Sequence, residues 1–418
     1  MSKRIIFLTQ WFDPEPAYHG EEFVRDLIRA GFHVEVVTGF PNYPGGKIYD
    51  GYKIRPYKKT ESKKGFTLTR LALYPSHSKS KLGRILNYLS FFLSATFYLT
   101  FFARSADLVY VYHPPLTVGL AAALSKYIRR WPIILTIQDL WPDTLKTTGM
   151  INNPVVLKII GWSAVWLYRK ADHIIVQSWG FKKQILKRGV KELKTSVIIN
   201  WTNEVSNVNS PNVPNFNEKH QFRVLFAGNL GPAQDLYSVT KAAKILYKSN
   251  PSIGFYFLGS GIEKVKLQKY VRENNLENVV FWPRVSSKDV MPYLLGADAL
   301  LVHLENDPLF SITIPSKTQA YLYAGKPIIM GVSGDAAYLI RKSGGGLVVT
   351  PSDPYCLSDT IKKMSEMPCE QLNLMGDLAS EFYDKYLCKE KGFASFVGIF
   401  KDVMAGRIVD KKWGSKII

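Results

Sequence analysis

The order of hydrophobic and polar residues divides the chain into two series of alternating strands and helices. In the first 200 residues, short apolar runs such as IIFLTQ, LVYVYH and PIILTI are separated by longer segments with helical periodicity. The pattern restarts at FRVLFAGN (222–229) and continues through SIGFYFLGSG (252–261), ALLVHL (299–304) and PIIMGV (327–332). Such alternation is typical of parallel, doubly wound α/β sheets. The sequence therefore predicts two such domains in series.

A polar stretch separates the two series. Residues 201–220 are rich in Asn and contain two Pro, a composition that is typical of a linker. We expect a first domain at residues 1–205 and a second at 206–385. A final helical segment at 386–418 is expected to return to the first domain. The length of 418 residues fits two cores of ordinary size.

Basic residues are concentrated before one uncharged segment. The chain carries 54 Lys and Arg against 34 Asp and Glu, a net charge of +20, which indicates an anionic partner. Residues 53–84 contain ten Lys or Arg and a single acid, Glu61, and residues 85–103 follow without any charge. A basic segment beside an apolar helix is typical of a surface that enters lipid headgroups.

Three interpretations of this region stay open. Residues 85–103 have a borderline length for a membrane span, but their polar side chains disfavour one. A buried core helix after a solvated basic loop would give a similar pattern. We expect surface association with a membrane through segment 53–104. The basic residues assigned to it are Lys58, Lys59, Lys63, Lys64, Lys79, Lys81 and Arg84.

Three loops of the second domain have the composition of a phosphate site. Glycine lets backbone N–H groups approach an anion, although a tight turn requires glycine without any ligand. The residues concerned are Gly228, Asn229, Gly259, Ser260, Gly261 and Ser316, the last as the expected N-cap of a helix.

A lysine stands at the start of that helix. Helix N-termini carry partial positive charge, so Lys317 is electrostatically misplaced unless an anion lies between the two. Together with Arg284, which follows the strand VVFWP, Lys317 could neutralise the diphosphate of a nucleotide. A solvated lysine is the alternative.

Three residues of the first domain are candidates for catalysis, since open sheets bind ligands at the carboxyl ends of their strands. Asp139 follows the strand PIILTI, where it could orient a bound substrate, or only cap a helix. His113 ends the strand LVYVYH and could contact a ligand, although a lone His is often a core residue. Glu15 lies in the first strand-to-helix loop and could instead be a solvated turn acid.

No metal site and no cofactor are expected. Asp139 and Asp143 in DLWPD have the wrong spacing for a clear metal pair. Cys356, Cys369 and Cys388 lack His partners at metal-ligand spacing, and we expect them to be reduced, mostly buried thiols.

Taken together, these motifs resemble the retaining glycosyltransferases of family 4. The resemblance covers nearly the whole chain, with FPNYPGGK and QDLWPD in the first domain and FAGNLG, FLGSG and IPSK in the second. More narrowly, the chain is similar to the WbuB-like group of O-antigen and capsule transferases. The resemblance implies the GT-B fold, in which two doubly wound, Rossmann-like domains face a central cleft.

The resemblance also implies partners. The second domain would bind a nucleotide sugar, for which we expect UDP linked to an N-acetylated deoxyhexose such as N-acetyl-L-fucosamine. The first would bind the acceptor, a polyprenyl-diphosphate-linked sugar, with the protein peripheral on the cytoplasmic face of the bacterial inner membrane. In such an enzyme Asp139 could orient the acceptor hydroxyl or the donor sugar, and His113 could contact the sugar. We expect no nucleic acid partner, because the sequence has none of the usual motifs for one.

Two features depart from the family pattern. The family's pair of Glu, eight positions apart, would fall at Ile312 and Ala320, so the ribose contact would pass to Gln319 or to backbone groups. The family's phosphate-binding Arg and Lys correspond to Asn229 and Gln234. Lys317 and Arg284 would then neutralise the phosphate charge.

Two other classes of protein stay open from the sequence. A UDP-sugar 2-epimerase shares the GT-B architecture, but it needs no membrane surface. A non-catalytic polyanion-binding protein would also explain the net charge. The basic run that adjoins an apolar helix fits lipid better than duplex nucleic acid.

Overall fold

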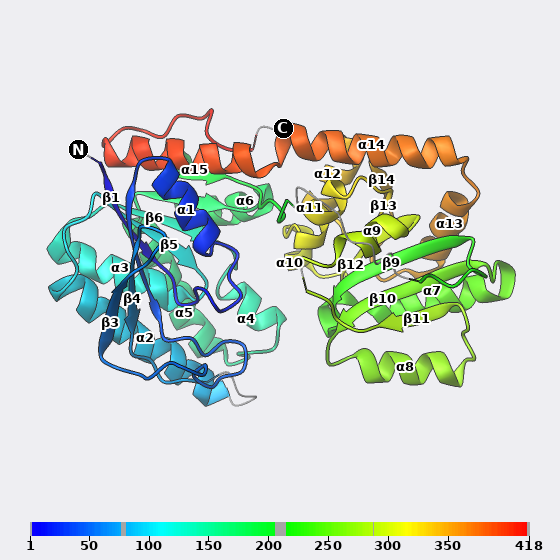
Figure 1. Cartoon of the computed structure of the whole chain (residues 1–418), viewed down its shortest axis with the longest axis horizontal. Coiled ribbons are helices and arrows are strands. Elements are labelled where there is room, and N and C mark those ends of the chain that lie inside the picture. Colours follow the sequence, from blue (N-terminus) through cyan, green and yellow to red (C-terminus); the bar gives the residue numbers. More distant parts are fainter. Residues whose placement is uncertain (1, 77–80, 205–214, 287, 416–418) are drawn as a thin grey trace. The chain divides into compact units, whose positions relative to one another are not determined.

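The computed structural model contains two compact α/β units and describes residues 2–76, 81–204, 215–286 and 288–415 (Figure 1). The first unit comprises Met1–Gln177, Phe181–Ile198 and Phe393–Gly414. The second comprises Ser178–Gly180, Ile199–Gly392 and Ser415–Ile418. Each unit has its own parallel sheet and its own core.

The sheet of the first unit has the strand order β3-β4-β2-β1-β5-β6-β7-β8. All neighbouring pairs are parallel except β3 and β4. The chain moves outward from β1 in both directions, so β1 and β5 flank a topological switch point, where open sheets bind ligands. The strands are β1 (Arg4–Leu8), β2 (His33–Gly39), β3 (Tyr57–Glu61), β4 (Thr67–Leu71), β5 (Leu108–His113), β6 (Ile133–Ile137), β7 (His173–Val176) and β8 (Thr195–Val197).

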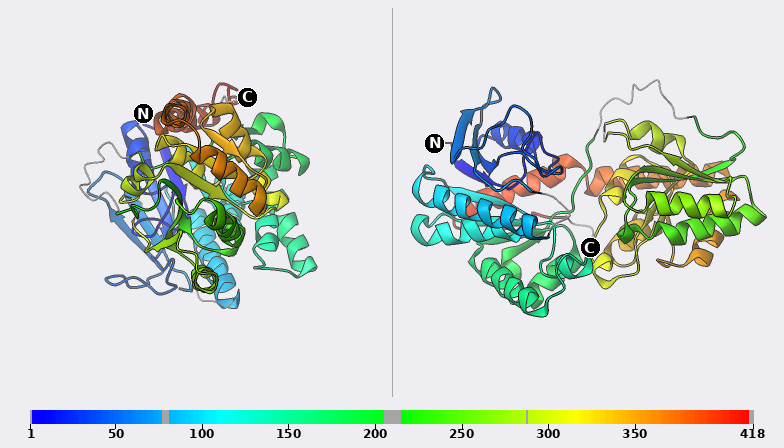
Figure 2. Two further views of the ribbon diagram at one scale, coloured as in Figure 1. Left: turned by 90° about the vertical axis from the view of Figure 1, so that its right-hand side faces the viewer. Right: turned by 90° about the horizontal axis from the view of Figure 1, so that it is seen from below.

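Helices cover both faces of this sheet. Helices α2, α3 and α5 lie along one face, and α1, α6 and α15 lie along the other (Figures 1 and 2). Asn153 caps the start of α5, because its side chain accepts hydrogen bonds from the N–H groups of Val155 and Val156. The helices are α1 (Glu21–Arg29), α2 (Lys81–Phe101), α3 (Leu116–Arg129), α4 (Asp143–Thr147), α5 (Pro154–Lys170), α6 (Trp179–Lys187) and α15 (Lys389–Met404).

The sheet of the second unit is entirely parallel, with the order β11-β10-β9-β12-β13-β14. Its switch point lies between β9 and β12. The strands are β9 (Phe222–Asn229), β10 (Ile253–Ser260), β11 (Val279–Trp282), β12 (Ala299–His303), β13 (Ile328–Gly331) and β14 (Gly346–Val348).

The helices of the second unit also form two layers. Helices α7, α8 and α13 lie on one side of the sheet, and α11, α12 and α14 lie on the other (Figure 1). Their bounds are α7 (Leu236–Ser249), α8 (Lys264–Glu273), α9 (Met291–Gly296), α10 (Pro308–Ser311), α11 (Ser316–Tyr323), α12 (Asp335–Ser343), α13 (Pro354–Ser365) and α14 (Cys369–Tyr386).

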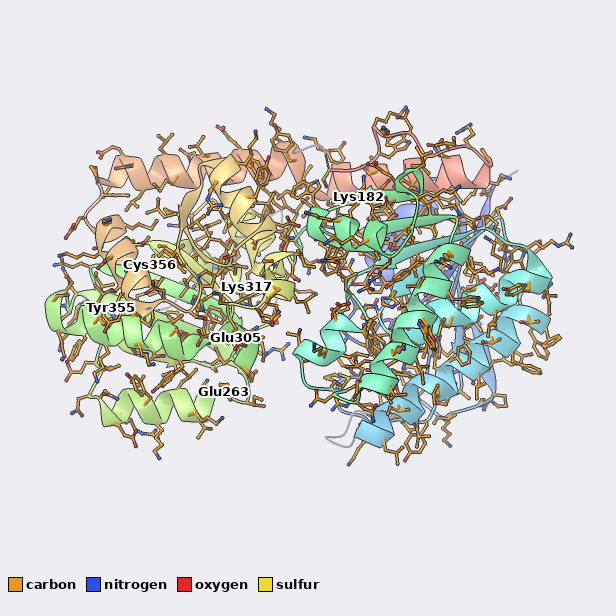
Figure 3. The ribbon with its side chains drawn as sticks, turned by 180° about the vertical axis from the view of Figure 1, so that it is seen from behind. Lys182, Glu263, Glu305, Lys317, Tyr355 and Cys356 are labelled. Carbon is orange, nitrogen blue, oxygen red and sulfur yellow. The ribbon has the colours of Figure 1, made fainter. Side chains whose placement is uncertain are left out.

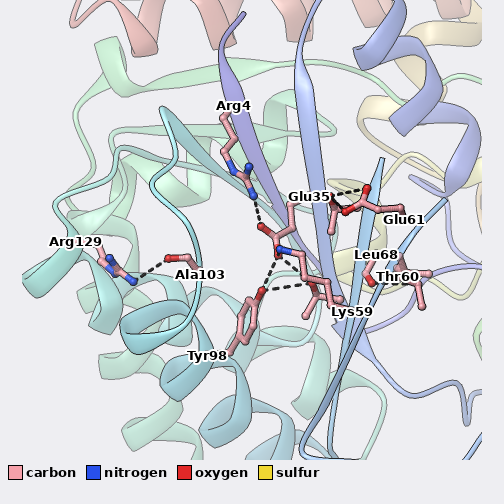
Figure 4. A network of polar contacts seen from close by, with 11 residues as sticks. Arg4, Glu35, Lys59, Thr60, Glu61, Leu68, Tyr98, Ala103 and Arg129 are labelled. Atoms are coloured by element: carbon pink, nitrogen blue, oxygen red, sulfur yellow. Dashed lines mark hydrogen bonds and ion pairs between the residues drawn. The ribbon is translucent and has the colours of Figure 1, made fainter. Parts of the chain in front are cut away.

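A buried carboxylate ties α2 to the first sheet (Figure 4). Glu35 accepts hydrogen bonds from the Tyr98 hydroxyl at 2.7 Å, the Thr69 hydroxyl at 2.9 Å and the Arg4 guanidinium at 2.5 Å. Lys59 adds an ion pair at 3.6 Å. Burial alone would raise the pKa of Glu35, but the hydrogen bonds and the Lys59 charge outweigh it, and the pKa lies below its usual value.

Two expectations from composition can be compared with the structure. The three cysteines are free, but none is buried: Cys369 is exposed, and Cys356 and Cys388 are partly exposed. The expectation of mostly buried thiols was wrong, because these residues lie on or beside the surface helices α13, α14 and α15. Within the described ranges, no helix is long and apolar enough to cross a membrane.

Candidate functional site

Lys317 is a partly buried cation at the carboxyl end of β9. It lies in the first turn of α11, and its Nζ is 4.7 Å from the centroid of the Phe226 ring. The side chain covers Gly228, where a Cβ would lie 2.9 Å from Nζ. Among the residues that the structure describes, the ammonium has no ion pair and no hydrogen bond. Burial lowers the pKa of Lys317 to about 8.

The start of α11 differs in one detail from the expectation. Pro315 occupies the cap position with extended backbone (φ −61°, ψ 139°), and no side chain caps the helix. The prediction of Ser316 as the N-cap was therefore wrong: the rigid proline ends the turn one residue earlier, and Ser316 is already helical. The first N–H groups of α11 thus have no side-chain acceptor as a cap.

Gln319 faces the backbone of this turn. It is buried, and its amide nitrogen, in the orientation that satisfies its neighbours, donates to the carbonyl oxygens of Pro315 at 2.8 Å and Ser316 at 3.2 Å. These contacts stabilise the helix start. The ribose contact suggested for Gln319 stays a prediction. The family's two Glu positions hold Ile312, which packs against Gly180, and a partly exposed Ala320.

Glycines bring the loops after β9 and β10 into direct contact. Gly228 and Gly259 have φ angles of +144° and +152°, and a Cβ on Gly259 would lie 1.9 Å from the carbonyl oxygen of Gly228. Leu230 N–H donates to the Ser260 carbonyl at 2.8 Å, and a Cβ on Gly261 would lie 2.2 Å from the Leu230 oxygen. The close approach of the two segments therefore requires glycine at Gly259 and Gly261, whereas at Gly228 a side chain would meet Lys317.

The other donor-site candidates lie at the same edge but farther from Lys317. Asn229 and Ser260 are exposed at the ends of β9 and β10. Arg284 is exposed after β11, a strand that β10 separates from β9, and it has no partner in the described part of the chain. The structure thus brings Lys317 to Gly228, whereas Arg284 lies at the side of the sheet.

Sequence reasoning missed two side chains at this edge. Glu305 follows β12, the neighbour of β9, and its exposed carboxylate forms no ion pair within the described ranges. Figure 3 shows Lys317 and Glu305 along the same edge of the unit. Lys264 donates to the Gly259 carbonyl at 3.1 Å and so fixes the end of β10. The position of Glu305 two residues after a strand was the signal available in the sequence.

Two ionisable residues of the first unit lie at the carboxyl ends of β5 and β6. His113 is fully buried, and neither of its ring nitrogens has a hydrogen-bond partner in the part of the chain described. Burial lowers the pKa of His113 to about 3, so its ring is neutral at pH 7. Asp139 is partly exposed, its carboxylate lacks a described partner, and burial raises its pKa to about 6.

Glu15 joins two loops through their backbones. Its Oε1 accepts from the N–H groups of Asn42 and Tyr43, both at 2.8 Å, and Oε2 accepts from Phe12 N–H at 3.3 Å. Burial raises the pKa of Glu15, and these bonds and the charge of Arg70 oppose the rise. The carboxylate therefore connects the loop after β1 to the loop after β2. A catalytic role for Glu15 stays a prediction.

Two of the basic residues assigned to the membrane are engaged in ion pairs. Lys59 pairs with the buried Glu35 at 3.6 Å, and Lys64 pairs with Glu21 on α1. Their charges are partly neutralised within the first unit. They are consequently weaker candidates for a lipid contact than unpaired lysines.

The other members of that set differ in accessibility. Lys58 and Lys63 are exposed and form no ion pair with any described residue. Arg84, in the first turn of α2, has a buried Nε without a described partner. Lys79 and the side chain of Lys81 lie outside the described residues.

Solved structures share the fold of this chain. Sucrose-phosphate synthase from Thermosynechococcus elongatus superposes with a TM-score of 0.70 at 16% identity, covering 97% of this chain and 100% of that one. HepE of Anabaena, solved in complex with UDP and glucose, gives a TM-score of 0.63 at 17% identity, with 94% and 98% covered. The prediction of a GT-B fold with two doubly wound domains is confirmed.

Sequence comparison defines the family. The model of the glycosyl transferase 4-like domain matches residues 17–201, and that of glycosyl transferases group 1 matches residues 210–381. Together the two matches span most of the chain, which belongs to the family 4 glycosyltransferases of GT-B fold. A relative that is 25% identical over 315 residues, 73% of this chain and 76% of its own, is described as a candidate colanic acid biosynthesis glycosyl transferase, WcaI of Escherichia coli (strain K12).

Proposed function

We propose that this glycosyltransferase moves a sugar from a UDP-linked donor to a lipid-diphosphate-linked sugar acceptor during assembly of a bacterial surface polysaccharide, O-antigen or capsule. The likeness to a colanic acid enzyme supports the polysaccharide, and the UDP complex of a protein with the same fold supports the donor. N-acetyl-L-fucosamine is the sugar that the resemblance to the WbuB-like group favours. The reaction proposed is metal-independent and retains the anomeric configuration.

The observation that carries the proposal is Lys317. A partly buried ammonium without a carboxylate partner costs free energy, and a bound anion would relieve that cost. It lies at the start of α11, where uncapped N–H groups also favour an anion. Both groups would stabilise the diphosphate as the bond between the anomeric carbon and UDP breaks and UDP leaves with the electron pair.

Asp139 and His113 are proposed to act on the acceptor side. The pKa of Asp139, about 6, leaves most of its carboxylate ionised at pH 7, so it can accept a hydrogen bond from the attacking hydroxyl. His113 is neutral and its ring nitrogens have no described partner, but its ring is fully buried, so a contact with a sugar hydroxyl would require movement of the residues that cover it. The acceptor oxygen forms the new bond to the anomeric carbon, and its proton passes to the Asp139 carboxylate, which then releases it to water.

The donor is tested by thermal protection. A ligand at 100 times its dissociation constant adds about 2.7 kcal/mol to the free energy of unfolding. UDP and UDP-sugars should therefore raise the melting temperature, whereas ADP- and GDP-sugars at the same concentration should not. Protection by ADP- or GDP-sugars alone would contradict the proposed donor.

We place the protein on the cytoplasmic face of the inner membrane, bound peripherally through α2. This helix is apolar on two faces: one packs on the sheet, and the other is exposed, with Leu93 65% and Phe97 58% accessible. Monomeric soluble proteins rarely expose apolar patches of this extent. The exposed stripe consists of Leu82, Ile85, Leu86, Leu89, Leu93, Phe97 and Phe101.

The neighbouring helices and loop extend this surface. On α3 and α5, which lie on the same face of the sheet as α2 (Figure 2), Tyr127, Ile128, Ile159 and Trp162 are also exposed. A groove of about 500 Å³ runs between the end of α2 and residues 54–57, lined mainly by apolar side chains. Exposed basic residues beside it complement the anionic headgroups of a bilayer.

Vesicle sedimentation tests the membrane surface. The variant reverses four exposed basic residues without described ion pairs: Lys53→Glu, Arg55→Glu, Lys58→Glu and Lys63→Glu. Each basic residue near an anionic surface contributes about 1 kcal/mol, so binding to phosphatidylserine vesicles should fall at least about tenfold. A matched control reverses four exposed lysines of the second unit: Lys248, Lys288, Lys362 and Lys363. If the first variant sediments like the parent protein at low salt, the basic segment is only a solvated loop.

A further inference from the structure

Four partly exposed aromatic rings gather at the carboxyl ends of the strands in the first unit. The ring centroids of Trp11 and Tyr43 are 4.9 Å apart, those of Trp11 and Tyr88 are 6.5 Å apart, and those of Tyr88 and Trp141 are 6.1 Å apart. The four residues come from the loops after β1, β2 and β6 and from α2. None of them is fully buried, unlike core rings such as that of Phe12. We call these four residues the aromatic platform.

A chain of buried amides fixes three of the rings. Gln10 donates to the Asn87 side-chain oxygen at 2.6 Å, and Asn87 donates to that of Asn42 at 3.1 Å. All three amides are almost completely buried. In the sequence, each amide residue immediately precedes a platform ring.

Glu15 reinforces the same arrangement. It accepts hydrogen bonds from the backbone N–H groups of Asn42 and Tyr43. Two loops and α2 are thus connected by polar contacts that exclude water. A site whose side chains are held in place before the ligand arrives loses less entropy on binding.

Polar groups without described partners surround the platform. Asp139 lies two residues before Trp141, and the ring centroid of His113 is 6.2 Å from that of Trp141. Arg84 lies one helical turn before Tyr88, and its buried Nε has no hydrogen-bond partner in the described ranges. Burying a guanidinium donor without a partner is unfavourable, which points to a ligand acceptor there.

We infer that the aromatic platform binds the sugar ring of the acceptor by stacking, while Arg84 binds the diphosphate to which that sugar is attached. A hexose or N-acetylhexosamine has an apolar C–H face that matches an aromatic ring, and its hydroxyl groups would meet the partly exposed Asp139 at the rim. The inference rests on the proposed function, since it assigns the acceptor to this site. It also explains why α2 joins the lipid-facing stripe to the site: Arg84 and Tyr88 belong to the same helix.

Two probes separate the sugar from the diphosphate. The first is farnesyl diphosphate, and the second is the same lipid with N-acetylglucosamine on its terminal phosphate. Isothermal titration calorimetry without donor measures the affinity of the full chain for each. We expect the parent protein to bind the sugar-bearing probe about five- to tenfold more tightly, a ratio that stacking on aromatic rings can supply.

The variants assign this ratio to residues. Tyr88→Ala should abolish the ratio and leave the affinity for farnesyl diphosphate unchanged. Arg84→Gln should lower the affinity of the protein for both probes about tenfold and preserve the ratio of the two affinities. Tyr355→Ala, which removes an exposed ring of the second unit, should change neither the two affinities nor their ratio. Tyr88→Leu keeps the apolar volume of α2 and serves as a second variant if the alanine protein does not fold.

Equal binding of the two probes by the parent protein would overturn the inference, even if sugar transfer is observed. A ratio that survives in Tyr88→Leu would also overturn it. Because binding is measured without donor, a failure of sugar transfer would contradict the proposed function alone. The loss of the ratio in the Tyr88 variants, with UDP affinity unchanged, supports the platform.

Discussion

Removal of the charge at Lys317 should weaken nucleotide binding and also stabilise the empty protein. Its Nζ lies over the Phe226 ring and beside Gly228 with no described ion pair or hydrogen bond, so removal of the charge loses the weaker contact with that ring and no ion pair among the described residues. The substitution Lys317→Met keeps the chain length and the apolar packing. We expect the dissociation constant of UDP to rise about 10- to 100-fold, because a hydrogen bond to a charged group contributes about 1.5–3 kcal/mol.

The stability of the empty protein follows from the lowered pKa. The pKa of Lys317 falls from 10.5 to about 8 in the folded protein. Keeping the side chain charged at pH 7 therefore costs up to roughly 3 kcal/mol, since one pKa unit is worth about 1.4 kcal/mol. Between pH 8 and 10.5 the unfolded chain binds more protons, so this cost disappears as pH rises. The empty Lys317→Met protein should accordingly melt at a higher temperature at pH 7.

Calorimetry with UDP and thermal melting at pH 7 and pH 9 measure both effects. The affinity of the parent protein for UDP should fall above pH 8 as Lys317 loses its proton, and the variant should lack this part of the pH dependence. Lys326→Met is a matched control, because burial also lowers the pKa of Lys326, which precedes β13 at the opposite edge of the sheet. Unchanged UDP affinity in Lys317→Met would refute the assignment.

Two further substitutions test other parts of the account. Asp139→Asn should lower kcat at least about tenfold and leave the affinity for UDP within twofold of the parent value. The kcat of the parent protein should fall below pH 6, because the Asp139 carboxylate gains a proton there. Normal turnover with a lowered Tm would show that Asp139 only supports the fold. Tyr98→Phe should destabilise the protein at pH 7 by about 1–2 kcal/mol, because it removes a hydrogen bond to Glu35. The lowered pKa of Glu35 gives stability that is complete above the unfolded pKa of about 4.3 and is lost as pH falls through the folded pKa. The effect of Tyr98→Phe in urea denaturation should therefore shrink at low pH, and an equal loss at pH 7 and pH 3 would contradict this explanation.

The sequence was sufficient for the architecture because strand and helix periodicities are local. The runs LVYVYH and PIILTI became β5, which ends at His113, and β6, whose following loop holds Asp139. The lysine at the start of α11 was also identified from its local setting. These features depend on neighbours in the sequence, which a single chain displays directly.

Contacts between distant segments could not be predicted in the same way. Nothing near Lys59 or Lys64 in the sequence indicates that their partners are Glu35 and Glu21. The amide of Asn87 likewise meets two loops that are 77 and 45 residues away. Such pairs depend on how α2 lies across the sheet, so the aromatic platform became visible only in the structure.

Sugar transfer to a lipid-linked acceptor can be measured with purified protein. Purified protein is incubated with a panel of UDP-sugars and a short-chain prenyl diphosphate that carries N-acetylglucosamine, and the lipid product is analysed by mass spectrometry. We expect the lipid to gain the mass of one sugar residue, with equimolar release of UDP and without added metal ion. Release of a free epimerised sugar nucleotide, with the lipid mass unchanged for every donor tested, would contradict it.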